Sequence, residues 1–228
     1  MQEGGKVVFG SFGLRVAAMR CVAGAGMAVA CVALLGSGVS SAAAGSGWSI
    51  QVTPNPVADS LLNGVSCSLP RACTAVGTSL IGSVASRALV VRWDGRRWKP
   101  QVTPKPRVDS VLVGVSCPHV NVCVAVGSGG RGSLVERWNG RRWRIQASGS
   151  GRSGDLAAVS CSSPSACTAV GLADDGQKAF VERWNGIRWV VQHLQTPAGF
   201  LIGVSCPSAT DCTAVGNSYP PGSTFAEQ

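Results

Sequence analysis

The stretch Gly64-Val65-Ser66-Cys67, followed by Cys73-Thr74-Ala75-Val76-Gly77, decides the fold because it returns along the chain. Gly-Val-Ser-Cys recurs at residues 114–117 and 203–206, and a variant with Ala158 in place of glycine occupies residues 158–161. In each copy a second cysteine follows six residues after the first, and the first cysteines lie 50, 44 and 45 residues apart. This period predicts one supersecondary unit repeated several times rather than a single irregular domain.

A second phrase, Trp-(Asp/Asn)-Gly-x-x-Trp, follows each of the first three cysteine pairs, at residues 93–98, 138–143 and 184–189. Asp-Gly and Asn-Gly between apolar runs are strong hairpin signals. We therefore expect four short antiparallel strands per unit, which in the first unit cover residues 61–67, 73–77 and 87–93 and resume near residue 97. Four strands in a repeat of about 40 to 50 residues are typical of a β-propeller blade.

The two ends of the repeat region complement each other. Residues 200–228 align with the other units only as far as the third strand. The orphan segment 48–60 matches a fourth strand, with Trp48–Pro56 corresponding to Trp98–Pro106. Joining them predicts an all-β propeller domain over residues 45–228, with complete repeats at 61–106, 111–148 and 155–196 and a fourth closed by strands from both termini. Closure would remove the open sheet edge. The alternative is a fragment of a larger propeller.

Residues 1–44 are predicted to be a secretory signal peptide. Arg15 and Arg20 accompany an apolar run at residues 21–35, and three alanines precede Gly45. The alternative is a membrane anchor, but this glycine-interrupted run is short for crossing a bilayer. We expect a secreted, extracellular protein without a membrane span after cleavage.

Export determines how the cysteines are interpreted. Outside the cytosol, the eight repeat cysteines are expected to form disulfides within each unit, since the partners end adjacent strands across a five-residue loop. A zinc site is the alternative, but the spacing is too long and no histidine recurs with it. We expect no metal and no cofactor. The predicted pairs are Cys67–Cys73, Cys117–Cys123, Cys161–Cys167 and Cys206–Cys212.

The phrases Gly-Val-Ser-Cys, Cys-Thr-Ala-Val-Gly and Glu-Arg-Trp-Asn-Gly-x-x-Trp resemble repeats of secreted, mostly actinobacterial proteins of the broad Kelch and sialidase-like β-propeller class. The resemblance covers residues 48–228 and implies a blade architecture in an extracellular setting. It implies no catalytic residue, because the Asp box of sialidases, Ser-x-Asp-x-Gly-x-Thr-Trp, does not occur in this sequence.

The tryptophans and arginines of the hairpins are the candidate ligand-binding residues. Indole rings can present flat faces to sugars while guanidinium groups donate hydrogen bonds, but a pattern repeated in every unit also suits tryptophans that pack between blades. The second interpretation is the stronger one. The candidates are Trp98, Arg97, Trp143, Arg142, Trp189 and Arg188.

Two features of the hairpins depend on the strand register. A pure two-residue turn would place Arg137 opposite Arg142, an unfavourable pairing, so a bulged turn is the alternative. The repeat-equivalent carboxylates Glu136, Glu182 and Glu227 are expected to pair with arginines across strands.

Charge and composition narrow the function. The formal net charge of +9 favours acidic partners, but the basic residues are scattered by repeat rather than gathered in one patch, which argues against nucleic-acid binding. His119 and His193 occupy non-equivalent positions, and no set of unlike polar groups breaks the repeat, so we expect no enzyme. The sequence predicts an extracellular binding module for a glycan, a wall polymer or a protein. The alternatives are a structural repeat or truncated propeller without a ligand, and a polysaccharide-active hydrolase or lyase.

Overall fold

The computed structural model describes residues 48–54, 59–81, 85–104, 109–130, 132–150, 154–173, 178–192, 194, 199–219 and 224–227. The predicted signal peptide and His193 lie outside these residues. Residues 49–228 form one compact unit, and Trp48 is the last residue of the other unit. Within the described residues, no helix is long and apolar enough to span a membrane.

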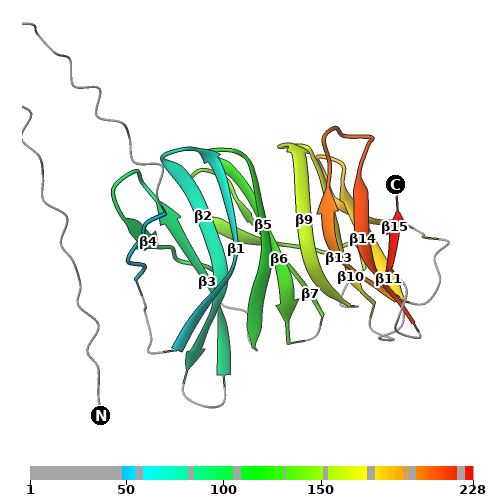
Figure 1. Cartoon of the computed structure of the whole chain (residues 1–228), viewed down its shortest axis with the longest axis horizontal. Helices are drawn as coiled ribbons and strands as arrows, with labels where there is room; N and C mark the ends of the chain where they lie inside the picture. The colour runs from blue at the N-terminus through cyan, green and yellow to red at the C-terminus, as the bar shows by residue number, and fades with distance from the viewer. Residues whose placement is uncertain are drawn as a thin grey trace, which may run out of the picture. The chain divides into compact units, whose positions relative to one another are not determined.

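The described strands form four antiparallel sheets, each built from consecutive strands of the chain (Figure 1). We name them sheets I to IV in chain order. Sheet I contains β1 (Asp59–Leu69), β2 (Ala72–Ile81), β3 (Ala85–Trp93) and β4 (Trp98–Pro100); sheet II contains β5 (Ser110–His119), β6 (Val122–Gly129), β7 (Ser133–Trp138) and β8 (Trp143–Gln146). Sheet III contains β9 (Asp155–Ser163), β10 (Ala166–Leu172), β11 (Ala179–Trp184) and β12 (Trp189–Gln192), and sheet IV contains β13 (Gly199–Ser205), β14 (Thr213–Ser218) and β15 (Thr224–Glu227).

The four predicted strands per repeat are confirmed in sheets I to III, and the two sequence phrases define their register. In sheet I, Cys67 on β1 lies opposite Cys73 on β2, and Trp93 on β3 lies opposite Trp98 on β4. The first strand of each sheet carries an irregularity in its pairing, between Leu62 and Gly64 in sheet I. Such a bulge bends and twists the strand locally.

The sheets pack face to face in chain order, because β5 contacts both β1 and β9, and β9 contacts β13. Alternate residues of a strand point to opposite faces, so strand β6 in the middle of sheet II contributes to two separate cores. Ala125 packs towards sheet I with Val76 and Val90, whereas Val124 and Val126 pack towards sheet III. Burial on both faces explains why these middle strands are almost continuously apolar.

The glycine of Gly-Val-Ser-Cys allows the first strands of neighbouring sheets to approach closely. A Cβ atom added at Gly64 would lie 2.7 Å from the carbonyl oxygen of Val113, and one at Gly114 would lie 3.1 Å from the Cα atom of Ala158. Any side chain at Gly64 would therefore push sheets I and II apart. The repeated phrase is thus a requirement of the contact between sheets.

The predicted ring closure by residues 48–60 is wrong for this structure. Sheet IV has three strands among the described residues, residues 48–54 form no strand, and Ile50 and Val52 are almost completely exposed. Closure requires sheet I to lie beside sheet IV, but they occupy opposite ends of the stack (Figure 1). The arrangement of whole sheets depends on contacts between strands far apart in the chain, which the repeat phrases do not encode.

Candidate functional site

A groove of about 810 Å³ lies between the segment that follows β4 and the hairpin that joins β7 to β8. It therefore bridges the outer edges of sheets I and II. Its lining residues are Pro100, Gln101, Val102, Thr103, Pro104, Trp138, Arg141, Arg142, Trp143, Arg144 and Ile145.

The hairpin beside the groove has a four-residue loop, because Trp138 lies directly opposite Trp143. The side-chain Oδ1 of Asn139 accepts hydrogen bonds from the backbone amides of Arg141, at 3.1 Å, and Arg142, at 3.0 Å. Gly140 has a φ of +88°, which favours glycine over other residues. The loop holds Arg141 and Arg142 exposed along the groove.

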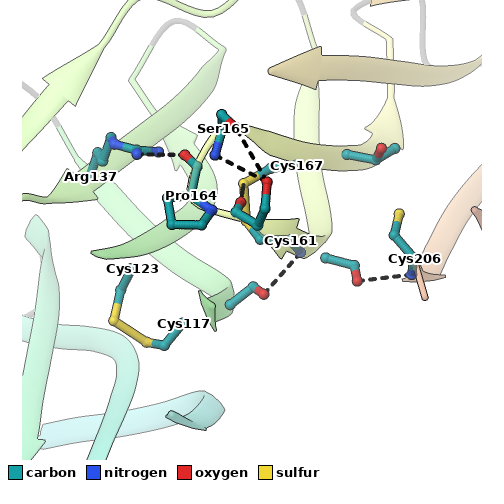
Figure 2. The surroundings of a disulfide bond; sticks show 12 residues. Cys117, Cys123, Arg137, Cys161, Pro164, Ser165, Cys167 and Cys206 are labelled. Atoms are coloured by element: carbon teal, nitrogen blue, oxygen red, sulfur yellow. Dashed lines mark hydrogen bonds between the residues drawn. A yellow bond between two sulfur atoms is a disulfide. The ribbon is translucent and has the colours of Figure 1, made fainter. Parts of the chain in front are cut away.

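The four-residue loop changes the arginine pairing that a two-residue turn would produce. Arg137 lies opposite Arg144 instead of Arg142. The Arg137 side chain is partly buried and turns towards sheet III, where its Nη2 donates a hydrogen bond of 2.7 Å to the carbonyl oxygen of Pro164 (Figure 2). Arg144 is left exposed on the groove.

The groove is cationic because sheet II lacks an ion pair that sheet I has. In sheet I, Lys99 Nζ lies 2.6 Å from Asp94 Oδ2, and this contact holds the pKa of Asp94 well below its usual range. Asn139 and Arg144 occupy the equivalent positions in sheet II. Within the described residues, no carboxylate forms an ion pair with Arg141, Arg142 or Arg144.

The corresponding hairpin of sheet III differs again. It carries Ile187, Arg188 and Val190 where sheet II has its three arginines. The triple-arginine hairpin therefore breaks the repeat at one place in the described chain. A deviation from a structural repeat is where a function specific to one face of the stack is expected.

The tryptophans pack between sheets, as the favoured sequence interpretation expected. Trp143 and Trp189 are each 3% exposed, and Trp98 is partly buried. The rings of Trp138 and Trp143 lie 5.8 Å apart, and the guanidinium of Arg92 in sheet I sits 4.6 Å from the centre of the Trp138 ring. An indole enclosed in this way has little free face for stacking on a sugar.

Only two of the six predicted ligand-binding residues, Trp143 and Arg142, line the groove. The others belong to the hairpins of sheets I and III, so the six residues do not form one site. Their contact with a ligand stays a prediction. The sequence reasoning missed Arg141, Arg144 and the segment from Pro100 to Pro104. The available signal was the exchange of Asp94 and Lys99 for Asn139 and Arg144.

The glutamates of the third strands do not form the predicted cross-strand pairs with arginine. Glu136 and Glu182 are fully buried between sheets. Glu182 accepts hydrogen bonds from the Ser148 hydroxyl and, at 2.8 Å, from the Ser150 amide. Both carboxylate oxygens of Glu136 lack a hydrogen-bond partner among the described residues, and burial raises the pKa of Glu136 to about 8. The side chain of Glu227 lies outside the description.

The four predicted disulfides are present, each joining the first two strands of a unit. At three of the four bridges, the backbone amide of the first cysteine donates a hydrogen bond to the preceding sheet. The backbone amide of Cys161 donates to the Ser116 hydroxyl and that of Cys206 to the Ser160 hydroxyl, both at 3.0 Å (Figure 2). Cys117 and Ser66 make the same contact between sheets I and II. In the described part of the chain, no group of three metal-ligating side chains gathers.

No protein-family model matches the chain, and no curated protein matches it. Among solved structures the chain is similar to YCF48 bound to a D1 peptide, with 14% sequence identity and a TM-score of 0.50. The alignment covers 76% of this chain and 51% of that one, so the chain spans about half the length of the structure it matches. Similarity at this identity concerns the fold alone. Together with the four-stranded sheets, it confirms the predicted all-β architecture of the propeller type.

Proposed function

We propose that this protein is an extracellular binding module that holds an extended acidic segment of a partner protein in the groove between sheets I and II. The observation that carries the proposal is the set of three exposed arginines, Arg141, Arg142 and Arg144, without a carboxylate partner in the described residues. Guanidinium groups bind carboxylates in a planar, two-point geometry that suits aspartate and glutamate side chains.

The shape of the groove favours a polypeptide over a glycan. Strand β8 is the outermost strand of sheet II, so its outer backbone edge has no neighbouring strand within the description. An extended peptide can pair with such an edge through main-chain hydrogen bonds, while its side chains reach the arginines. A glycan would instead rely on exposed aromatic faces, which the buried Trp138 and Trp143 do not offer. The similar structure contains a peptide bound to YCF48, a precedent in that protein for this kind of ligand.

An extracellular location is part of the proposal. It is supported by the disulfides, which persist in oxidising compartments, and by the predicted signal peptide. A polysaccharide-active hydrolase or lyase receives no support from the groove, because its lining residues include no carboxylate or histidine for acid–base chemistry. A purely structural repeat would not account for a groove that departs from the repeat pattern.

The test is binding of a fluorescent oligoglutamate peptide to the oxidised protein, followed by fluorescence anisotropy at two salt concentrations. Replacing Arg141, Arg142 and Arg144 together by glutamine should weaken binding at least tenfold. The matched control removes three other exposed arginines, Arg71, Arg87 and Arg96, and should weaken binding less than twofold.

Equal losses in the two triple variants would mean diffuse charge attraction and would refute a specific groove. Tighter binding of an acidic glycan than of the peptide would assign the site to the polymer class predicted from the sequence. No binding of either ligand by the folded protein would favour a scaffold without a ligand.

A further inference from the structure

A second pocket, of about 190 Å³, lies between sheets III and IV, at the opposite side of the stack from the arginine groove. It is lined by both apolar and hydrogen-bonding side chains, and its wall on sheet III includes a glutamine and an arginine. The lining residues are Thr168, Val170, Val181, Arg183, Gln192, Leu194, Val204, Thr210, Cys212 and Ala214.

At the contact between sheets II and III, tryptophans fill the equivalent position. In sheet II, the Gln146 Oε1 accepts a hydrogen bond of 3.0 Å from Nε1 of Trp189, which belongs to sheet III. The guanidinium of Arg137 lies 5.3 Å from the centre of the Trp184 ring. Gln192 and Arg183 are the repeat equivalents of Gln146 and Arg137. The pocket therefore presents to sheet IV the same groups that receive an indole elsewhere.

The chain also carries an indole that is not enclosed. Trp48 opens the segment Trp48-Ser49-Ile50-Gln51-Val52-Thr53-Pro54, which matches the segment that begins at Trp98. Trp48 is completely exposed, and residues 48–54 form no strand. Within the part of the chain that the structure describes, sheet IV has three strands where sheets I to III have four.

We propose that the pocket between sheets III and IV binds Trp48 of a second copy of this chain, whose residues 48–54 add a fourth strand beside β15. The two copies would then be arranged head to tail, with sheet I of one stacked on sheet IV of the other. Such a heterologous contact generates a ring or a linear chain of copies, depending on the rotation between them.

The same chain cannot supply this strand in the observed arrangement. Residues 48–54 are connected to β1 in sheet I, and five residue steps from Pro54 to Asp59 span at most about 18 Å. Sheets that pack face to face lie about 10 Å apart, so sheets I and IV are separated by roughly 30 Å across three spacings. A second copy has no such restriction.

The outer faces of sheets I and IV are complementary because each resembles one side of the contact that successive sheets make with each other. Sheet I exposes Leu62 and Val65, whose equivalents in sheet II, Leu112 and Val115, pack against sheet I. Sheet IV exposes Ile202 and Val215 at positions that face the next sheet in the other repeats.

The hydrogen bonds of the repeat continue the same match. The hydroxyls of Ser66, Ser116 and Ser160 accept backbone amide hydrogen bonds from the following sheet. Ser205 is the equivalent residue of sheet IV and is exposed. In the proposed contact, it accepts the backbone amide hydrogen bond of Cys67 in the second copy.

The experiment is sedimentation velocity over a wide concentration range, using the full chain recovered in oxidised form from an exporting host. We expect reversible association that Trp48→Ala weakens at least tenfold. Thr210→Trp, a change at an exposed residue on the rim of the pocket, should fill the pocket and have the same effect. Ile187→Ala, at an exposed apolar residue away from both faces, should leave association unchanged.

Mixing the Trp48→Ala and Thr210→Trp variants gives the decisive result, since each retains the half-interface that the other has lost. We expect a one-to-one heterodimer that does not grow further. A wild-type chain that stays monomeric, or association that survives Trp48→Ala, would overturn the proposal.

The fluorescence of Trp48 supplies a second readout that does not depend on the folding of the pocket variant. The difference between the wild-type and Trp48→Ala emission spectra isolates Trp48, and it should shift to the blue as concentration rises. A blue shift already present in the monomer would mean that Trp48 is enclosed by its own chain. That result would also refute the proposal. Binding of the oligoglutamate peptide should be unaffected by Trp48→Ala, so the two proposals fail separately.

Discussion

Replacing Gly127 by alanine should destabilise the protein strongly, because the backbone of the neighbouring strand occupies the space of the new methyl group. A Cβ atom at Gly127 would lie 2.0 Å from the carbonyl oxygen of Val111 and 2.9 Å from the Cα atom of Leu112. Relief of the first contact requires β5 and β6 to separate by about 1 Å or more. Overpacking of this kind costs about 1 to 3 kcal/mol, and each backbone hydrogen bond lost from the ladder adds about 1 kcal/mol.

We therefore expect Gly127→Ala to lower the free energy of unfolding by about 3 to 5 kcal/mol, which corresponds to a Tm decrease of roughly 10 °C for a domain of this size. The measurement is guanidinium denaturation of the oxidised protein, with the loss read from the midpoint at constant slope.

Gly129→Ala is the matched control in the same strand. Its Cβ would meet nothing closer than 3.6 Å, so stability should change by less than about 0.5 kcal/mol. Equal stabilities of the two variants would refute the argument that close backbone approach requires glycine at the end of Ala-Val-Gly.

Three further changes test the interior of the stack. Because burial raises the pKa of Glu136 to about 8 from an ordinary value of 4.5, the folded state holds a proton that the unfolded state releases, so the free energy of unfolding should fall as pH rises from about 4.5 to 8. Glu136→Gln should flatten that dependence in denaturation curves recorded across this range, and an unchanged slope would contradict the assignment. Ser148→Ala removes a hydrogen bond to the buried carboxylate of Glu182 and should cost about 1.5 to 3 kcal/mol in the same assay; a cost no larger than that of a surface substitution would disprove the contact. Replacing Cys161 and Cys167 together by serine opens a short loop and should cost about 2 kcal/mol, measured against the oxidised wild-type protein, whereas equal stability would show that the bridge adds nothing.

The strands could be predicted from the sequence because each repeat carries two independent signals of strand pairing, the cysteine pair and the hairpin phrase. Cys67 and Cys73 must lie opposite each other to form a bridge, and Asp94-Gly95 marks a hairpin between apolar runs. These are local constraints on neighbouring strands. The angle between whole sheets is not local, and for that reason the sequence left a closed ring and an open fragment as alternatives.

The burial of Glu136 was predictable but was interpreted incorrectly. Side chains two residues apart in a strand share a face, so Glu136 lies on the same face as Leu134 and Trp138, which pack against sheet I. Arg137 lies between them in sequence and therefore points to the other face. The expected pairing of Glu136 with an arginine of the return strand overlooked this period, because Glu136 lies opposite Ile145.

The groove required more than the sequence could provide. The exchange of Asp94 and Lys99 for Asn139 and Arg144 is visible in the alignment of repeats, and it removes an ion pair. Its consequence for binding depends on Pro100–Pro104 lying beside the next hairpin. That contact is between sheets, so only the packed structure places the arginines along a groove.

The hydrogen bonds between cysteine amides and serine hydroxyls in this stack all run in one direction. In each, the cysteine amide of one sheet donates to the serine hydroxyl of the sheet before it. Duplication or loss of one whole repeat in a gene would consequently bring together two faces that already fit. Insertion of a single residue within a strand would instead move every following side chain to the opposite face. The number of repeats is therefore free to change during evolution, while the spacing inside each repeat, from Gly-Val-Ser-Cys to the hairpin, is held by contacts on both sides.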